Sequence, residues 1–158
     1  MDDDGGDGCH MIGHADERET EEFVEDLKKA RRATEFLDDH KFSDRTLSEY
    51  LNQLLEEKGL ERKDVVKAAG INDIYGYDIF TSKKKRHPGR NYLISLAFTM
   101  GLTCRECDRL LKLADRSVLY PKNRRDAIIM FCLERHTTFD EVNMELYRRG
   151  EETLTKKD

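Results

Sequence analysis

The residues best suited to chemistry in this chain are the cations between positions 83 and 90. Five of these eight residues are basic, namely Lys83, Lys84, Lys85, Arg86 and Arg90. A dense local patch governs the attraction of phosphate groups more than the charge of the whole chain does. The alternative is a solvated surface loop, which is the common structure of a short charged run. Which of the two applies depends on the elements that position the cluster.

The segments on both sides of the cluster have the spacing of short amphipathic helices. One apolar face of the first helix is formed by Leu47, Tyr50, Leu51, Leu54 and Leu55. Gly59 is expected to end this helix, because glycine adopts a left-handed backbone without steric cost. Asn72 is expected to cap a third helix. Pro88 blocks a helix from running through it, so a fourth helix is expected from about Asn91.

The residues between these helix ends are small or apolar. The second helix carries Val65, Val66, Ala68 and Ala69 before Gly70, and their small size allows the following helix to approach closely. The expected inward anchors of the third helix are Ile71, Ile79 and Phe80. The expected buried residues of the fourth helix are Leu93, Leu96, Ala97 and Met100.

Two short motifs in this region resemble a known family. The turn Gly70-Ile71-Asn72 has the glycine, the apolar residue and the small polar cap that stand in the turn of lambda repressor-like, or XRE-type, helix-turn-helix proteins. The phrase LISLAFTMGL, residues 93–102, is similar to the end of that family's fourth helix. The resemblance covers about the central third of the chain, and it implies an all-α fold whose third helix enters the major groove of DNA.

The resemblance also assigns roles to particular residues. The base-reading positions are expected at Asp73, Ile74, Tyr77 and Asp78, with Tyr75 beside them. The phosphate-contacting positions are expected at Arg62 and in the basic loop, at Lys83, Lys84, Lys85, Arg86 and Arg90. Three features depart from the family pattern. Arg62 replaces a glutamine, Gly76 replaces a β-branched core residue, and Phe80 and Ser82 replace the usual glutamate and glycine.

These assignments predict a transcriptional regulator whose partner is double-stranded DNA, read over two half-sites by a homodimer. A second hypothesis belongs to another class. In it, the chain is a helical adaptor in which Ile74, Tyr75 and Tyr77 bind a protein partner, because tyrosine is common among interface anchors.

The net charge of −5 is unevenly distributed along the chain. Residues 1–46 hold 15 acidic and 7 basic side chains, a net charge of −8, whereas residues 47–158 hold 18 acidic and 21 basic ones, a net charge of +3. We expect residues 1–20 to form a disordered acidic tail and residues 21–43 an amphipathic helix. No apolar run approaches the roughly 20 residues that cross a bilayer, and no signal peptide is recognisable, so a cytoplasmic location is expected.

A repeat follows the helix-turn-helix region. Residues 91–119 and 126–154 align at a spacing of 35, and each copy carries a capping box, Thr103 with Glu106 and Thr138 with Glu141. Leu93, Leu96 and Ala97 align with Ile128, Phe131 and Cys132, so we expect corresponding inward faces. The predicted organisation is a helix-turn-helix domain over residues 44–119 and a C-terminal helical hairpin over residues 120–158, joined at the Tyr120-Pro121 turn.

The four cysteines are interpreted as structural and reduced. Cys104 and Cys107 have a spacing seen in metal sites, but no further pair of ligands has a matching spacing, so no metal is expected. Cys107 aligns with Val142, and Cys132 with Ala97, which are small apolar positions. The sequence also lacks a phosphate loop, a nucleophile elbow and a His-Glu helix motif, so neither an enzyme nor a cofactor is expected.

Overall fold

The structure, a computed structural model of the chain, describes residues 24–25, 28, 45–82 and 88–155. These residues form helices and no strands, which confirms the all-α prediction for this part of the chain. The helices are α4 (Leu47–Lys58), α5 (Arg62–Ala68), α6 (Asp73–Thr81), α7 (Arg90–Thr99), α8 (Cys104–Leu113), α9 (Arg124–Glu134) and α10 (Phe139–Arg148). The predicted tail lies outside the described residues. So does the helix predicted over 21–43, apart from the helical residues Val24, Glu25 and Lys28.

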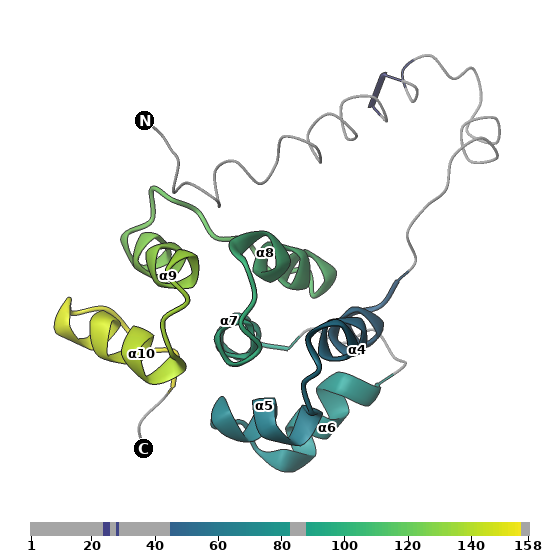
Figure 1. Ribbon diagram of the computed structural model, residues 1–158. Helices are drawn as coiled ribbons and strands as arrows, with labels where there is room; N and C mark the ends of the chain where they lie inside the picture. Colours follow the sequence, from purple (N-terminus) through teal and green to yellow (C-terminus); the bar gives the residue numbers. More distant parts are fainter. Residues whose placement is uncertain (1–23, 26–27, 29–44, 83–87, 156–158) are drawn as a thin grey trace.

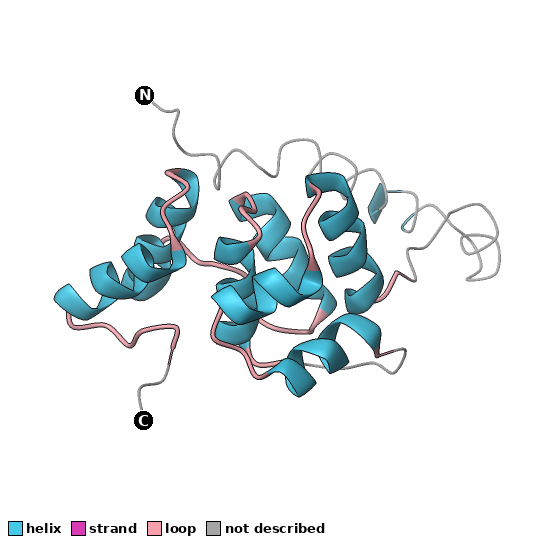
Figure 2. Cartoon of the chain, turned by 60° about the horizontal axis from the view of Figure 1, so that its bottom comes forward, coloured by secondary structure: helices cyan, strands magenta, loops and turns pink. Residues whose placement is uncertain are grey.

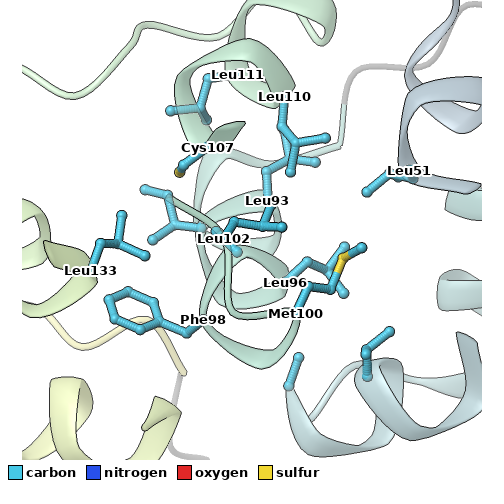
Figure 3. Close-up of a cluster of buried hydrophobic side chains, with 14 of the residues drawn as sticks. Leu51, Leu93, Leu96, Phe98, Met100, Leu102, Cys107, Leu110, Leu111 and Leu133 are labelled. Atoms are coloured by element: carbon cyan, nitrogen blue, oxygen red, sulfur yellow. The ribbon is translucent and has the colours of Figure 1, made fainter. Parts of the chain in front are cut away.

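Helix α7 lies in the middle of the helical assembly (Figure 1). On one side, α5 packs against α7 and α4 packs against α8, while α6 packs on both α4 and α5. On the other side, α9 packs against α8 and α10 packs against α7. Figure 2 shows the α9–α10 hairpin set beside the other helices in a second view. One continuous core joins the two sides, and Figure 3 shows Leu51 of α4 and Leu133 of α9 on opposite sides of the α7 side chains.

Local sequence signals determine most helix ends. Capping boxes start α4, α8 and α10, and left-handed glycines follow α4, α5, α7 and α10. A left-handed residue also follows α8 and α9, but there it is Asp115 and His136. At a spacing of 35, His136 corresponds to Gly101 and Asp115 to Gly150. The repeat therefore includes the backbone conformation of its turns.

Replacing His136 by glycine is expected to stabilise the protein by about 0.5–1 kcal/mol. A side chain in the left-handed region costs about 1–2 kcal/mol, and the greater freedom of glycine in the unfolded chain offsets part of that gain. The matched change Gly101→Ala places a side chain on the equivalent turn and should destabilise by about 1 kcal/mol. Urea unfolding measures both changes, and a lower midpoint for His136→Gly would contradict this explanation.

Hydrogen bonds repeat at the same spacing. The Leu119 amide donates to Asp108 Oδ1 at 3.0 Å, and the Leu154 amide donates to Asn143 Oδ1 at 2.8 Å. Arg90 donates to the carbonyls of Ser117 and Val118, as Arg125 does to those of Glu152 and Thr153. The α7–α8 and α9–α10 hairpins are thus two versions of one unit, as the alignment predicted.

The predicted match of inward faces is only partly correct. Leu96 of α7 is fully buried, whereas the aligned Phe131 of α9 is 52% exposed and lies under the guanidinium of Arg135. The reason is the surroundings of the two helices. α5 packs against α7, while α9 packs against α8 and α10.

The structure confirms the interpretation of the cysteines as buried, reduced thiols only in part. Cys107 and Cys132 are buried free thiols, as expected, and burial raises the pKa of the Cys107 thiol, which keeps it protonated and unreactive. Cys104 is also buried, but it is disulfide-bonded, so the prediction of a reduced thiol is wrong at this position. Among the described helices, none is long and apolar enough to cross a membrane.

Candidate nucleic-acid interface

A short turn joins helices α5 and α6, and hydrogen bonds from residues of the turn cap the end of α5 and the start of α6. Gly70 has a φ of 68°, and the Ile71 amide donates to the Val66 carbonyl at 3.1 Å. Asn72 Oδ1 then accepts from the amides of Ile74 and Tyr75 at 2.9 and 3.3 Å. The glycine and the cap were both predicted, and together they determine the direction in which α6 leaves the turn.

Gly76 allows the two helices of this motif to approach closely. A Cβ atom added at Gly76 would overlap both methyl carbons of Val66. The family resemblance marked Gly76 as a departure from a β-branched core residue. The structure gives the physical reason, because Val66 of α5 fills the space that a side chain on α6 would occupy.

The far end of α6 is attached to α4. Asn52 Nδ2 donates to the Phe80 carbonyl at 2.7 Å, and Ser48 Oγ donates to the Ser82 carbonyl at 2.9 Å. Ile79 and Phe80 are buried, as predicted. Helix α6 is therefore held at both ends, and its outer face has a defined orientation.

Three of the four predicted base-reading residues share that outer face. Asp73 is exposed, and Ile74 and Tyr77 are 81% and 56% exposed. Tyr77 follows Asp73 by four residues and Ile74 by three, so it is a neighbour of both on the helix surface. The fourth, Asp78, is half-buried. Tyr75 is also half-buried, and its ring packs edge-on against Tyr92 of α7 with 4.9 Å between ring centroids.

Helices α5 and α6 enclose a shallow hollow of about 420 Å³. Its lining consists of Arg62, Lys63, Asp64, Val66, Lys67, Asp73 and Tyr77. The Arg62 guanidinium lies over the Tyr77 ring, 4.7 Å from its centroid. Sequence reasoning found Arg62 but missed Lys63 and Lys67. The signal was present, because these two lysines are four residues apart and lie on the same face of α5.

The other predicted phosphate contacts have different outcomes. Lys83, Lys84, Lys85 and Arg86 lie outside the described residues. Arg90 is described, and its guanidinium donates to Asp126 Oδ1 and Oδ2 at 3.0 and 2.8 Å and to the carbonyls of Ser117 and Val118. These hydrogen bonds hold the Arg90 guanidinium inside the fold. We therefore no longer assign Arg90 a contact with a phosphate.

The charges of the α5–α6 surface are mixed. Arg62, Lys63 and Lys67 supply three cations, while Asp64, Asp73 and Asp78 supply three carboxylates. The carboxylates of α6 repel phosphates, and the cations on α5 attract them. The surface can therefore meet a phosphate backbone through α5 while α6 offers apolar and acceptor groups.

The comparisons with known proteins do not bear on the role of this surface. The chain matches no protein-family model, no curated protein and no solved structure.

Proposed function

We propose that the chain is a DNA-binding regulator of the XRE-type helix-turn-helix class. In this proposal α6 enters the major groove of double-stranded DNA, and α5 and the basic loop contact phosphates on its flanks. The observation that carries the proposal is the arrangement of one surface. The exposed residues of α6 border a hollow whose other wall carries Arg62, Lys63 and Lys67.

The dimensions of α6 suit this role. Nine residues at about 1.5 Å each give a helix about 13 Å long, and the major groove, about 12 Å wide, admits an α-helix. The helix is also supported from behind, because Gly76 contacts α5 and Asn52 of α4 binds its last turn. A rigid support of this kind places side chains reproducibly against base edges.

The side chains of α6 favour particular contacts. An exposed isoleucine packs well on the methyl group of thymine, and an aspartate accepts from the amino group of cytosine. Ile74 and Asp73, which are exposed on the outer face of α6, are the proposed base-facing residues. A homodimer would place two copies of α6 on half-sites about one helical turn apart, roughly 34–36 Å.

The changes Lys63→Ala and Lys67→Ala, made together, are expected to weaken binding to every duplex alike. Each phosphate that a cation neutralises contributes about 0.9 to the slope of log affinity against log salt, so the slope should fall by up to about 1.8. Fluorescence anisotropy over a salt series measures this slope. The matched control is Lys122→Ala, an exposed cation before α9 that should leave the slope unchanged. An unaltered slope in the double variant would contradict the role given to α5.

In contrast to the lysine changes, Ile74→Ala should change the sequence preference of binding at one or two base pairs.

A second candidate function is supported by the apolar character of the same surface. Ile74 and Tyr77 are large apolar side chains open to solvent, and exposed apolar groups of this kind mark protein interfaces. In that alternative the chain is a helical adaptor that binds a protein partner through α6. Retention on immobilised random duplex DNA at about 50 mM salt separates the two functions. The regulator is retained and elutes as salt rises, whereas the adaptor passes through.

A further inference from the structure

The contact between Arg62 and Tyr77 joins the two helices of the proposed DNA-binding motif. Arg62 is the first residue of α5, and Tyr77 lies in the middle of α6. The guanidinium is 4.7 Å from the ring centroid, within the range of a cation–π interaction. Both residues line the hollow between the helices.

The donors of Arg62 are not used within the described part of the chain. None of the carboxylates in residues 45–82 and 88–155 forms an ion pair with it, although Asp64 and Asp73 line the same hollow. Arg90 is the opposite case, since both of its terminal nitrogens donate to Asp126. Stacking occupies the face of a guanidinium and leaves its in-plane N–H groups able to bind an oxyanion through two parallel hydrogen bonds.

We propose that Tyr77 is a positioning residue whose ring holds the Arg62 guanidinium at the rim of the hollow, where it binds a backbone phosphate of DNA. This inference rests on the proposed function and changes one role within it, because Tyr77 was expected to read a base. An arginine side chain has many rotamers, and a stacked one loses less conformational entropy when it binds. The ring face under the guanidinium is then unavailable to a base.

Lys63 and Lys67 make the same rim attractive to a phosphate. They line the hollow with Arg62 and supply charge without a stacking partner among the described residues. Asp64 and Asp73 oppose them, so the position of the Arg62 guanidinium relative to these carboxylates decides whether the rim attracts or repels an anion. A ring that holds the guanidinium in one place therefore has a direct effect on affinity.

The test compares Tyr77→Phe with Tyr77→Leu in the full chain. The probe is a random-sequence 20-base-pair duplex, with a duplex enriched from a random pool on the wild-type protein as the second probe. Phenylalanine keeps the aromatic face and should bind both duplexes as the wild type does. Leucine should weaken binding to both by about two- to fivefold, the range expected for one exposed cation–π contact. The ratio of the two affinities should stay the same.

A double-mutant cycle with Arg62→Ala identifies the group through which Tyr77 acts. Adding Tyr77→Leu to Arg62→Ala should cause no further loss of affinity, because the residue that Tyr77 positions is already absent. The NMR shift of the Arg62 Nε–H group provides a readout without DNA. Ring current should move this resonance upfield in the wild type and in Tyr77→Phe, and the displacement should disappear in Tyr77→Leu.

The outcomes distinguish this inference from the function on which it rests. If the wild type does not bind the random-sequence duplex and enriches no duplex from the pool, the proposed function fails and the inference fails with it. If the wild type binds but Tyr77→Leu binds equally well, or changes the ratio between the duplexes, Tyr77 does not act through Arg62 and only the inference is overturned. Tyr77 is more than half exposed, so unchanged circular dichroism is expected and checks that each variant is folded.

Discussion

Gly76→Val is expected to destabilise the protein by about 3 kcal/mol. The new side chain would occupy the space of the Val66 methyl groups, so α5 and α6 must separate or distort. Overpacking of a well-filled site typically costs about 1–3 kcal/mol, and Val66 is 3% exposed with little room to move. Urea unfolding followed by circular dichroism measures the loss.

The partner change Val66→Ala supplies the control for Gly76→Val. Alone, it should destabilise by about 1–2 kcal/mol, because it removes buried methyl groups. Combined with Gly76→Val, it should recover much of the lost stability, since the space vacated on α5 receives the side chain on α6. If the two losses simply add, the helices do not meet at these two residues.

Asp126→Ala is expected to cost about 3–5 kcal/mol of stability. Asp126 is 6% exposed, and its carboxylate accepts from both terminal nitrogens of Arg90 and from the amide of Tyr120 at 3.0 Å. Removal of the carboxylate leaves the largely buried guanidinium of Arg90 without its counter-charge. An uncompensated buried charge is strongly destabilising. Chemical unfolding of the full chain measures the effect.

Two comparisons test this explanation. Glu145→Ala removes ion pairs with Arg148 and Arg149 on the more exposed surface of α10 and should cost at most about 1 kcal/mol. The double variant Arg90→Leu with Asp126→Leu should be less destabilised than Asp126→Ala, because no charge is left unpaired. If the double variant loses more stability than Asp126→Ala does, the Arg90–Asp126 pair stabilises the fold by more than the neutralisation of its two charges.

The sequence by itself determined the described helices and most of their ends. A capping box such as Thr103 with Glu106 satisfies amides within three residues, and a left-handed glycine such as Gly70 acts on the turn that contains it. These are local interactions, so spacing is enough to predict them. The 35-residue repeat was visible for the same reason, because each unit uses the same local signals.

Only the tertiary structure determined which individual side chains are paired, buried or exposed. Charge suggested Arg90 as a phosphate ligand, but its partner Asp126 is 36 residues away in sequence. Phe131 has the pattern of a core residue and is exposed because the neighbours of α9 differ from those of α7. The hollow that joins Arg62 to Tyr77 exists only where α5 passes α6, and Gly76 sets how closely they pass. Each of these outcomes depends on which surfaces meet across the core, and residue spacing along one helix carries no information about the helix that packs on it.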